Sequence, residues 1–571
     1  MALVGDLVLI LFIAMVFGFV AYKVKFPLVV GYLIGGAGAS WFLADFVHIG
    51  EVESVAAIGL ALLMFTLGLE FSLKRLRSLG EIIILGSLLQ IILTIICGIF
   101  FFPFFGYDLY NSFFLGAVFS LSSTAVVVKI LTDRGEIDSL HGEIAVGWLL
   151  VQDLATLPLI VLLPAIGGAM QSGGTLLWSF LSVARAMAVS IFGLIVILLL
   201  GRKIIPFLIE KVAQTKIREL LLLSVVLICL AFAYVSNNVG FSFALGAFLG
   251  GMVIASTAAN HAVFSEVRPL RDIFSIIFFV SLGFLLDPNF LWQNLPLILF
   301  LTVMLILGKF LLSSLLVLVL GYHTRVAFFV GVMLTSVGEF AFILGQIGKT
   351  QGLIGNETYM LILSITMMSL IISSPLIVGM ERIYRIVRGI LKRYFTFLVP
   401  IFKSFDEQKL DKTLTYSEHA VVLGHGRVGK YISHALFSSG IEYVVVDYNN
   451  HIIKNLRKSG IAVIYGDPSE IDVLKAANVD KAKVVVIAIP DRFATEVIIS
   501  HCLSLNPNII IICRTHHEED QNKLKELGVE VLIQPEFEAA LSITGKLLKL
   551  YNLNLPYIED RIATLKKEHG F

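Results

Sequence analysis

The sequence contains few charged residues. Asp, Glu, Lys and Arg make up 15% of its 571 residues, whereas hydrophobic residues make up 57%. Ordinary soluble domains do not reach this balance, so the composition excludes a purely soluble protein and predicts an integral membrane protein. The formal net charge of +1 argues neither for nor against nucleic-acid binding. We expect no nucleic-acid partner.

Cysteine is also scarce. Cys97 and Cys229 lie in apolar segments, and Cys502 and Cys513 lie in the more polar carboxy-terminal part. This pattern indicates no disulfide framework, which favours a cytoplasmic location for the carboxy-terminal part. A secretory signal is lacking too, because no basic region precedes residues 5–22 and no small-residue cleavage site follows them. We therefore expect residues 5–22 to form the first membrane span.

Long apolar segments dominate the rest of the sequence. Thirteen candidate spans are centred near residues 14, 37, 62, 92, 121, 153, 193, 226, 249, 279, 308, 336 and 369. Lys and Arg gather in the loops after the odd-numbered spans, and the opposite loops hold little beyond Arg185 and Lys349. The positive-inside rule therefore places the amino terminus outside and the carboxy-terminal part in the cytoplasm.

The balance of apolar and charged residues changes near residue 380. We predict a transmembrane domain at 1–381, an amphipathic helix and linker at 382–417, and a cytosolic domain at 418–571. Basic and apolar residues alternate at helical spacing after residue 381, which fits a helix at the inner membrane surface. We expect the linker to couple the two domains.

The membrane domain contains an internal repeat at a constant offset of 215 residues. Gly31, Gly35, Gly36, Gly68 and Gly116 become Gly246, Gly250, Gly251, Gly283 and Gly331. Glycine is frequent in membrane helices, which explains two or three such matches but hardly five in register. The offset crosses seven spans, an odd number, so the second copy is inverted. Inverted repeats are typical of secondary transporters, whose sites lie near the midplane where helices break.

The segment 142–163 carries Gln152 and Asp153 at its middle. A carboxylate at this depth costs roughly 2.5–3.5 kcal/mol on insertion scales, so it persists mainly where it faces a cavity and has a function. Asp153 is the candidate ion-carrying residue; the alternative is a carboxylate neutralised for packing. His141 and Glu143 lie at the cytoplasmic mouth of this span, and we expect solvated loop residues there rather than a proton relay.

Two spans are predicted to break. The fifth holds a row of hydroxyl groups that can satisfy freed backbone groups or ligate a cation. These residues are Ser120, Ser122, Ser123 and Thr124. In the twelfth span, Glu339 would offset the positive amino-terminal ends of half-helices, with direct cation ligation as the alternative. Lys309, in the eleventh span, needs a carboxylate partner, and both Asp153 and Glu339 remain open.

Strands and helices alternate after His419. The strand 420–423 leads into a glycine-rich loop and a helix, and a second strand, 443–446, ends at Asp447. Strands are also expected at 462–465, 484–489, 509–513 and 529–533. This order predicts a Rossmann-type α/β domain that binds an adenine nucleotide, AMP or NAD(H), rather than NADP, because Asp447 would repel a 2′-phosphate. The alternative is a Rossmann domain that serves only for dimerisation.

The expected nucleotide site draws mainly on the glycine-rich loop. Its candidate residues are Gly424, His425, Gly426, Arg427, Val428, Gly429, Asp447 and Asp467.

Several motifs together resemble the cation/proton antiporter-2 family, in its glutathione-gated potassium efflux (Kef-type) branch. They are SLSSTAVV at 120–127, the Gln152–Asp153 pair, ALGAFLGGM at 244–252 and GEFAF at 338–342. The resemblance implies an α-helical transporter of thirteen spans, with a dimerisation domain and a mobile core domain. The Gln–Asp pair favours potassium over sodium.

The tail resembles a TrkA amino-terminal (RCK-N) domain. Tyr465-Gly466-Asp467 and Gln534-Pro535-Glu536 support this resemblance. One further helix is expected after the sixth strand, without a second subdomain.

The expected function is potassium/proton antiport in a cell inner membrane. Asp153 would hold either potassium or a proton, in a homodimer gated by nucleotide binding. The family also implies glutathione or its conjugates and an ancillary cytosolic protein as regulators of some members; Arg514, His516 and His517 are the residues considered for glutathione. The alternatives are a sodium/proton antiporter and, from another class, a ligand-gated potassium channel, against which the inverted repeat and the mid-membrane carboxylate argue. We expect no enzymatic activity, since no catalytic domain follows the Rossmann unit.

Overall fold

The computed structural model describes most of the chain. The described residues are 2–24, 26, 28–43, 49–70, 80–137, 139–171, 205–212, 214–215, 217–238, 243–255, 257, 260–284, 286–394, 416–489, 492–514, 524–529 and 531–568. Contacts divide the chain into two compact units. The first comprises Met1–Val127, Ala145–Ser313 and Gly331–Val378, and the second comprises Val128–Ile144, Ser314–Val330 and Gly379–Phe571.

Apolar helices make up the amino-terminal two thirds of the chain. In order they are α1 (Ala2–Lys23), α2 (Leu28–Leu43), α3 (Ile49–Glu70), α5 (Glu81–Phe101), the 3-10 turn η1 (Phe102–Phe105), α6 (Leu109–Ser120), α7 (Thr124–Asp133), α8 (Leu140–Gln171), α10 (Arg218–Asn238), α11 (Phe243–Ala255), α12 (Asn260–Phe284), α13 (Pro288–Val319), α14 (Thr324–Met333), α15 (Phe340–Thr350) and α16 (Asn356–Val378). Within the described residues, seven helices are long and apolar enough to cross a membrane. The predicted multi-pass helical architecture is confirmed, and only the span expected near residue 193 lies outside the described residues.

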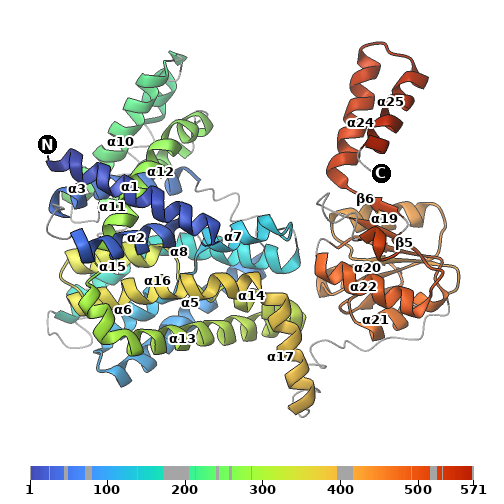
Figure 1. Cartoon of the computed structure of the whole chain (residues 1–571), viewed down its shortest axis with the longest axis horizontal. Coiled ribbons are helices and arrows are strands. Elements are labelled where there is room, and N and C mark those ends of the chain that lie inside the picture. The colour runs from blue at the N-terminus through green and yellow to red at the C-terminus, as the bar shows by residue number, and fades with distance from the viewer. Residues whose placement is uncertain are drawn as a thin grey trace. The chain divides into compact units, whose positions relative to one another are not determined.

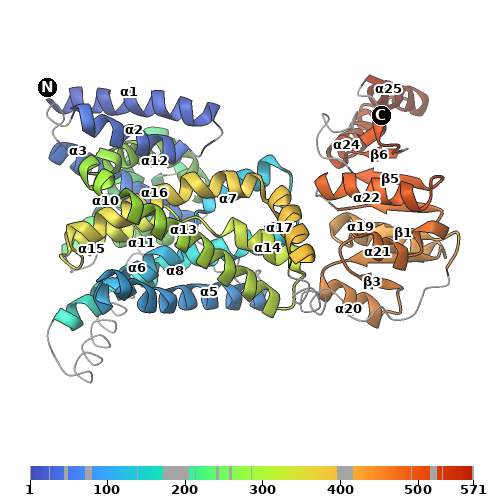
Figure 2. The same ribbon diagram turned by 60° about the horizontal axis from the view of Figure 1, so that its bottom comes forward.

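Ten of the described helices of the first unit form two groups. One group contains α1, α2, α3, α10, α11 and α12, and the other contains α5, α6, α15 and α16 (Figures 1 and 2). Each group draws helices from both halves of the 215-residue repeat. The repeat is therefore a feature of the packing as well as of the sequence.

Repeat-related glycines make close helix contacts within the first group. A Cβ atom on Gly36 of α2 would lie 2.1 Å from the Val280 carbonyl oxygen of α12, beside Gly283. A Cβ atom on Gly251 of α11 would lie 2.0 Å from the Phe65 carbonyl oxygen of α3, close to Gly68, whose own Cβ would lie 2.2 Å from the Phe248 oxygen. Because Gly36 and Gly68 shift by 215 residues onto Gly251 and Gly283, the two contacts are equivalent.

Both predicted helix breaks are confirmed. The fifth span consists of α6 and α7, which are separated by Leu121, Ser122 and Ser123, and Leu121 has an extended backbone conformation with φ −80° and ψ 139°. The twelfth span consists of α14 and α15, with residues 334–339 between them. The breaks free backbone groups that must find other partners within the membrane.

The second unit contains a parallel six-stranded sheet. Its strands are β1 (Ala420–Leu423), β2 (Tyr443–Asp447), β3 (Val463–Tyr465), β4 (Val484–Ile487), β5 (Ile510–Arg514) and β6 (Val531–Ile533), and their spatial order is β3-β2-β1-β4-β5-β6. This order is that of a dinucleotide-binding Rossmann fold. β1 and β2 consist of buried residues throughout, as expected where helices cover both faces of a parallel sheet. The predicted Rossmann architecture is confirmed, with strand ends shifted by one or two residues.

The helices of the second unit follow the strands. They are α17 (Met380–Tyr394), α19 (Arg427–Ser438), α20 (Asn450–Lys458), α21 (Ile471–Ala476), the 3-10 turn η2 (Val479–Lys481), α22 (Arg492–Leu505), α24 (Pro535–Leu550) and α25 (Leu555–Glu568). α17 lies where the sequence predicts an amphipathic helix, whereas residues 395–415 of the linker lie outside the described residues. The expectation of one helix after the sixth strand was wrong. Asn552, with φ +58°, lies in the turn that separates two helices there.

We predict that Gly251→Ala lowers the thermal unfolding temperature of the purified protein. The new methyl group has no room against the main chain of α3, and such overpacking costs roughly 1–3 kcal/mol. Gly308→Ala in α13 is the matched control, because nothing lies within 4 Å of its Cβ position. Equal unfolding temperatures for the two variants would contradict the close contact between α11 and α3.

Candidate functional site

The two broken spans bond to each other at their breaks. The Gly338 amide donates to the Leu121 carbonyl at 3.1 Å, and the Ser123 amide donates to the Ser336 hydroxyl at 3.3 Å. The Ser122 hydroxyl donates to the Leu334 carbonyl at 3.0 Å. Shifted by 215 residues, Leu121 becomes Ser336 and Ser123 becomes Gly338. Each copy of the repeat therefore supplies partners for the backbone groups that the other copy frees.

Lys309 lies at the centre of this crossing and is 1% exposed. Its ammonium donates to the Leu121 carbonyl at 3.1 Å and to the Ser336 carbonyl at 2.8 Å. These repeat-related carbonyls follow the ends of α6 and α14, whose helix dipoles place partial negative charge there. A carboxylate partner was expected for Lys309. The hydrogen bonds that the structure gives to its ammonium go to main-chain oxygens instead.

Asp153 lies on α8 beside the start of α7. Its Oδ2 accepts a hydrogen bond of 2.9 Å from the hydroxyl of Thr124, the first residue of α7, and both side chains are partly buried. The positive amino-terminal end of α7 favours a negative charge at this position. The structure thus brings the predicted ion-carrying residue to one of the predicted breaks.

Gln152 bonds to the main chain of the break, and Ser120 bonds to the main chain of α6. The Gln152 Oε1 accepts from the Ser122 amide at 2.8 Å, and the Ser120 hydroxyl donates to the Ala117 carbonyl at 2.7 Å. Gln90 on α5 also belongs to this group, since its Nε2 donates to the Ser120 carbonyl at 3.2 Å. Sequence reasoning missed Gln90. Its signal was a lone amide in the middle of an apolar span.

Glu339 immediately precedes α15. Its Oε2 accepts from the Ser123 hydroxyl at 3.3 Å, so its carboxylate lies near the amino-terminal end of a half-helix, where the dipole favours an anion. This position agrees with the predicted offset of positive potential. Direct cation ligation by Glu339 stays an alternative.

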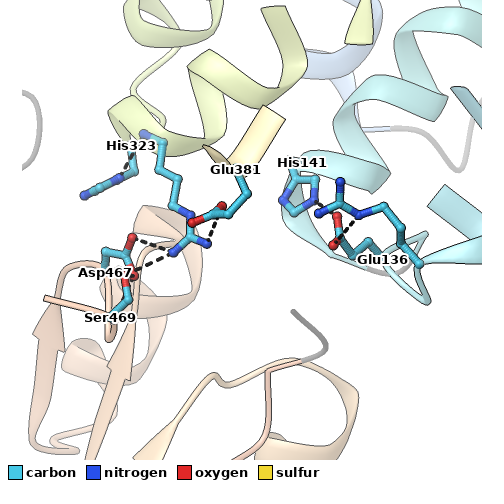
Figure 3. Close-up of polar contacts among 8 residues, drawn as sticks. Glu136, His141, His323, Glu381, Asp467 and Ser469 are labelled. Carbon is cyan, nitrogen blue, oxygen red and sulfur yellow. Dashed lines mark hydrogen bonds and ion pairs between the residues drawn. The ribbon is translucent and has the colours of Figure 1, made fainter. Parts of the chain in front are cut away.

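A buried cluster occupies the connection between α7 and α8. The His141 Nε2 lies 3.2 Å from Glu136 Oε2, and the Arg134 Nε donates to Glu136 Oε1 at 2.9 Å (Figure 3). Burial raises the pKa of Glu136. The hydrogen bonds and charges of His141 and Arg134 lower it by a larger amount, so the net shift of the pKa is downward. His141 is 2% exposed, so the expectation of a solvated loop residue was wrong for it, whereas Glu143 is exposed as expected.

The glycine-rich loop joins β1 to α19. Gly424 has φ +92°, and a Cβ on Gly429 would lie 1.9 Å from the Gly424 carbonyl oxygen, so both positions require glycine. The Asp447 carboxylate accepts from the amides of His425 and Asn449, each at 2.7 Å. Burial raises the pKa of Asp447, although these amide bonds oppose the shift. Asp447 therefore also holds the loop in shape.

A pocket opens beside this loop. Its lining residues in the second unit are Ser139, Leu140, Glu143, Gly424, Gly426, Val446, Asp447, Tyr448, Asn449, Ile452, Pro468, Ala488, Ile489 and Arg514. The backbone amides at the start of α19 suit a phosphate group, and Asp447 suits a ribose. The side chain of Arg427 and residues His516 and His517 lie outside the described residues.

Asp467 forms an ion pair within the second unit. Its Oδ2 accepts from Arg325 Nη1 at 3.0 Å, and Arg325 Nη2 donates to Glu381 at 3.1 Å (Figure 3). The Asp467 Oδ1 accepts from Ser469. Burial raises the pKa of Asp467, but the Arg325 guanidinium, His323 and Ser469 hold it well below its usual range. Asp467 was predicted to bind the nucleotide, yet the structure places its carboxylate in this network.

Two family matches cover most of the chain. The transmembrane sodium/hydrogen exchanger family matches residues 8–379, and the TrkA-N domain family matches residues 420–535. The first match alone spans more than half of the chain. The chain belongs to the sodium/hydrogen exchanger family. It is thus a multi-pass membrane protein of a transporter family with a TrkA-N domain.

Two bacterial proteins are similar to the chain over most of its length. The chain is 32% identical to YbaL of Escherichia coli (strain K12), which bears a provisional cation/proton antiporter name, over 94% of this chain and 95% of YbaL. It is 28% identical to a glutathione-regulated potassium-efflux system protein of Haemophilus influenzae, over 95% of this chain and 87% of that protein. The sodium/proton antiporter MjNhaP1 of Methanocaldococcus jannaschii aligns in structure over 66% of this exchanger and 97% of MjNhaP1, with 14% identity and a TM-score of 0.49.

We predict that Arg325→Leu destabilises the protein more than the double change Arg325→Leu with Asp467→Leu. The single change leaves a buried carboxylate unpaired, at a cost of roughly 3 kcal/mol, and the double change removes that charge. The measurement is thermal unfolding of both purified variants at pH 7 and at pH 4.

The pH dependence of this difference follows from the depressed pKa of Asp467. Such a group stabilises the folded state above its unfolded pKa of about 3.9, and the stabilisation is lost as the pH falls through the folded pKa. In Arg325→Leu the partner that depresses the pKa is gone, so Asp467 protonates at higher pH and the penalty should shrink at pH 4. A penalty that is equal at both pH values would contradict the ion pair.

Proposed function

We propose that this exchanger couples potassium efflux to proton uptake through Asp153. The observation that carries the proposal is the contact of the Asp153 carboxylate with the Thr124 hydroxyl at the broken fifth span. Carboxylate and hydroxyl oxygens are the ligand types that suit a hard monovalent cation, and the dipole of α7 stabilises the ionised carboxylate when the cation has left. The Gln152–Asp153 pair and the potassium-efflux relatives support potassium over sodium.

One carboxylate that holds either a proton or a cation enforces exchange. If Asp153 faces the two sides of the membrane in turn, each passage carries one ligand or the other, never both. The helix group with α5, α6, α15 and α16 would be the mobile core, and the group with α1–α3 and α10–α12 would form the dimer contact. In this proposal residues 1–381 carry out transport. They lie in a cell inner membrane, and the amino terminus is on the outer side.

The Rossmann-type domain at 418–571 is the proposed regulator. Its pocket suits an adenine nucleotide, AMP or NAD(H), and a nucleotide biases transport only by its difference in affinity between states. The linker at 382–417 was the expected route of coupling. The ion pair of Arg325 with Asp467 supports a second route, because Arg325 lies in the first turn of α14, which leads to the twelfth-span break. Glutathione and an ancillary cytosolic protein are further candidate regulators, by analogy with the relative named for glutathione regulation.

Asp153→Asn should abolish cation-driven proton movement while leaving folding intact. An amide at this position cannot alternate between a proton and a cation. The measurement is proton flux in proteoliposomes driven by potassium and, separately, by sodium, with Asp6→Asn as the control, since Asp6 is a buried acid of α1 outside the crossing. Near-wild-type flux in Asp153→Asn would refute the mechanism, and flux driven by sodium alone in the wild type would refute the choice of cation.

Asp447→Ala should weaken the binding of AMP and NAD(H) by roughly tenfold, because the ribose loses its acceptor and the loop loses two amide contacts. The variant should also alter the nucleotide dependence of flux without abolishing exchange. Isothermal titration calorimetry measures the binding. Asp472→Ala is the control, because Asp472 is exposed on α21. A wild-type protein that binds no adenine nucleotide would show that the domain serves only for dimerisation.

A further inference from the structure

We propose that Gln90 is a positioning residue for cation exchange, which acts on Asp153 through Gln152 and the break in the fifth span. The inference rests on the proposed function and adds a residue to the same site. Gln90 lies at the middle of α5 and is 0% exposed. A buried amide must find hydrogen-bond partners, since an unpaired donor or acceptor costs roughly 1–3 kcal/mol.

Two glutamine side chains bridge the broken backbone. Gln90 Nε2 donates to the Ser120 carbonyl at 3.2 Å, Gln152 Nε2 donates to Gln90 Oε1 at 2.7 Å, and the Ser122 amide donates to Gln152 Oε1 at 2.8 Å. Ser120 ends α6, and Ser122 lies in the extended segment that follows it. The two amides therefore connect a carbonyl and an amide that the helix break leaves without helical partners.

The ends of this chain determine how both amides are oriented. The Ser122 amide can only donate, so Gln152 must turn its oxygen toward Ser122 and its nitrogen toward Gln90. The Ser120 carbonyl can only accept, so Gln90 must turn its nitrogen toward Ser120. Thr94 agrees with this arrangement, because its hydroxyl donates to the main-chain carbonyl of Gln90 at 2.8 Å and therefore accepts from Gln90 Nε2 at 3.1 Å. The orientation is consistent at every link.

The repeat gives a second, independent reason. Thr94 on α5 shifts by 215 residues onto Lys309 on α13, so α5 and α13 are related helices. In the second copy, Lys309 donates to the Ser336 carbonyl at the twelfth-span break. In the first copy, Gln90 donates to the Ser120 carbonyl at the fifth-span break. Each break thus receives a buried donor from the corresponding helix. In the second copy this donor is Lys309, and in the first copy it is the neutral amide of Gln90, beside the Leu121 carbonyl that Lys309 also contacts.

The bridge lies next to the proposed cation site. Gln152 directly precedes Asp153, and Ser122 lies two residues before Thr124, whose hydroxyl contacts the Asp153 carboxylate. The segment is therefore attached to α8 at two points, Gln152 to Ser122 and Asp153 to Thr124. Without Gln90, the Gln152 amide is free to turn, the first attachment weakens, and the distance between Asp153 and Thr124 is no longer held.

Gln90→Leu tests this role by removing the bridge while keeping a similar volume. We expect the cation concentration for half-maximal exchange by the folded variant to rise roughly five- to tenfold, as the loss of one buried hydrogen-bond chain would give. Gln346→Leu is the matched control. Gln346 lies on α15 in the same helix group and accepts a hydrogen bond from the Tyr359 hydroxyl at 2.6 Å, away from the bridge. It should leave the half-maximal concentration unchanged.

Gln90→Glu should make exchange depend on pH in a way that a purely structural role of Gln90 would not. When protonated, the carboxyl group donates to the Ser120 carbonyl and accepts from Gln152, so the bridge persists; when ionised, it has no proton to donate. The ratio of variant to wild-type exchange should therefore fall as the pH rises from 6 to 9. This measurement also decides the question if Gln90→Leu fails to fold.

The outcomes separate this inference from the proposed function. If the wild type exchanges potassium, or sodium alone, the Gln90 variants are compared with that cation. The role of Gln90 would be overturned, while exchange itself stands, by either of two results. In the first, Gln90→Leu and Gln346→Leu both have the wild-type half-maximal concentration. In the second, the ratio of Gln90→Glu to wild-type exchange does not change with pH. A wild type that exchanges neither cation would overturn the proposed function, and the inference with it.

Discussion

The structure depends on satisfying backbone groups that two helix breaks free inside the membrane. A carbonyl or amide left unpaired in hydrocarbon costs several kcal/mol, so a broken span persists only where other groups replace the helical hydrogen bonds. Here the replacements come from the opposite break, from the Lys309 ammonium and from the amides of Gln90 and Gln152. The break in the fifth span in turn places the Thr124 hydroxyl beside Asp153. The features that permit the breaks are thus the features that build the site.

The glycine contacts and the crossing express the same repeat. Gly36 and Gly68 of the first copy lie against Gly283 and Gly251 of the second, and Lys309 binds two carbonyls that the 215-residue shift relates. The two copies differ at the proposed ion-carrying position, because the 215-residue shift places Met368 where the first copy has Asp153. The first copy therefore carries Asp153, while the second supplies Lys309 and Glu339. The proposed carrier role of Asp153 therefore has no counterpart in the second copy.

The second unit joins a nucleotide-type pocket to short segments of the exchanger sequence. Asp447 holds the glycine-rich loop, and Asp467, after the next strand, pairs with Arg325 at the start of α14. Asp447 ends β2, and Asp467 follows its parallel neighbour β3 by two residues. The burial of Glu136 and His141 adds a polar cluster before α8.

The sequence by itself determined the architecture, because architecture follows from patterns along the chain. Apolar length, the row of hydroxyl residues and the strand–loop–helix order were enough to predict the multi-pass helical architecture, both breaks and the Rossmann sheet. The orientation and the inversion of the repeat stay predictions. The place of Asp153 in the middle of an apolar segment made it the candidate ion-carrying residue. Only the tertiary structure decided which groups pair across the molecule, since hydrogen-bond partners 30 to 216 residues apart leave no local pattern. It assigned carbonyl partners to Lys309, an arginine to Asp467, a buried place to His141 and a bridging role to Gln90, because each depends on where two distant helices meet.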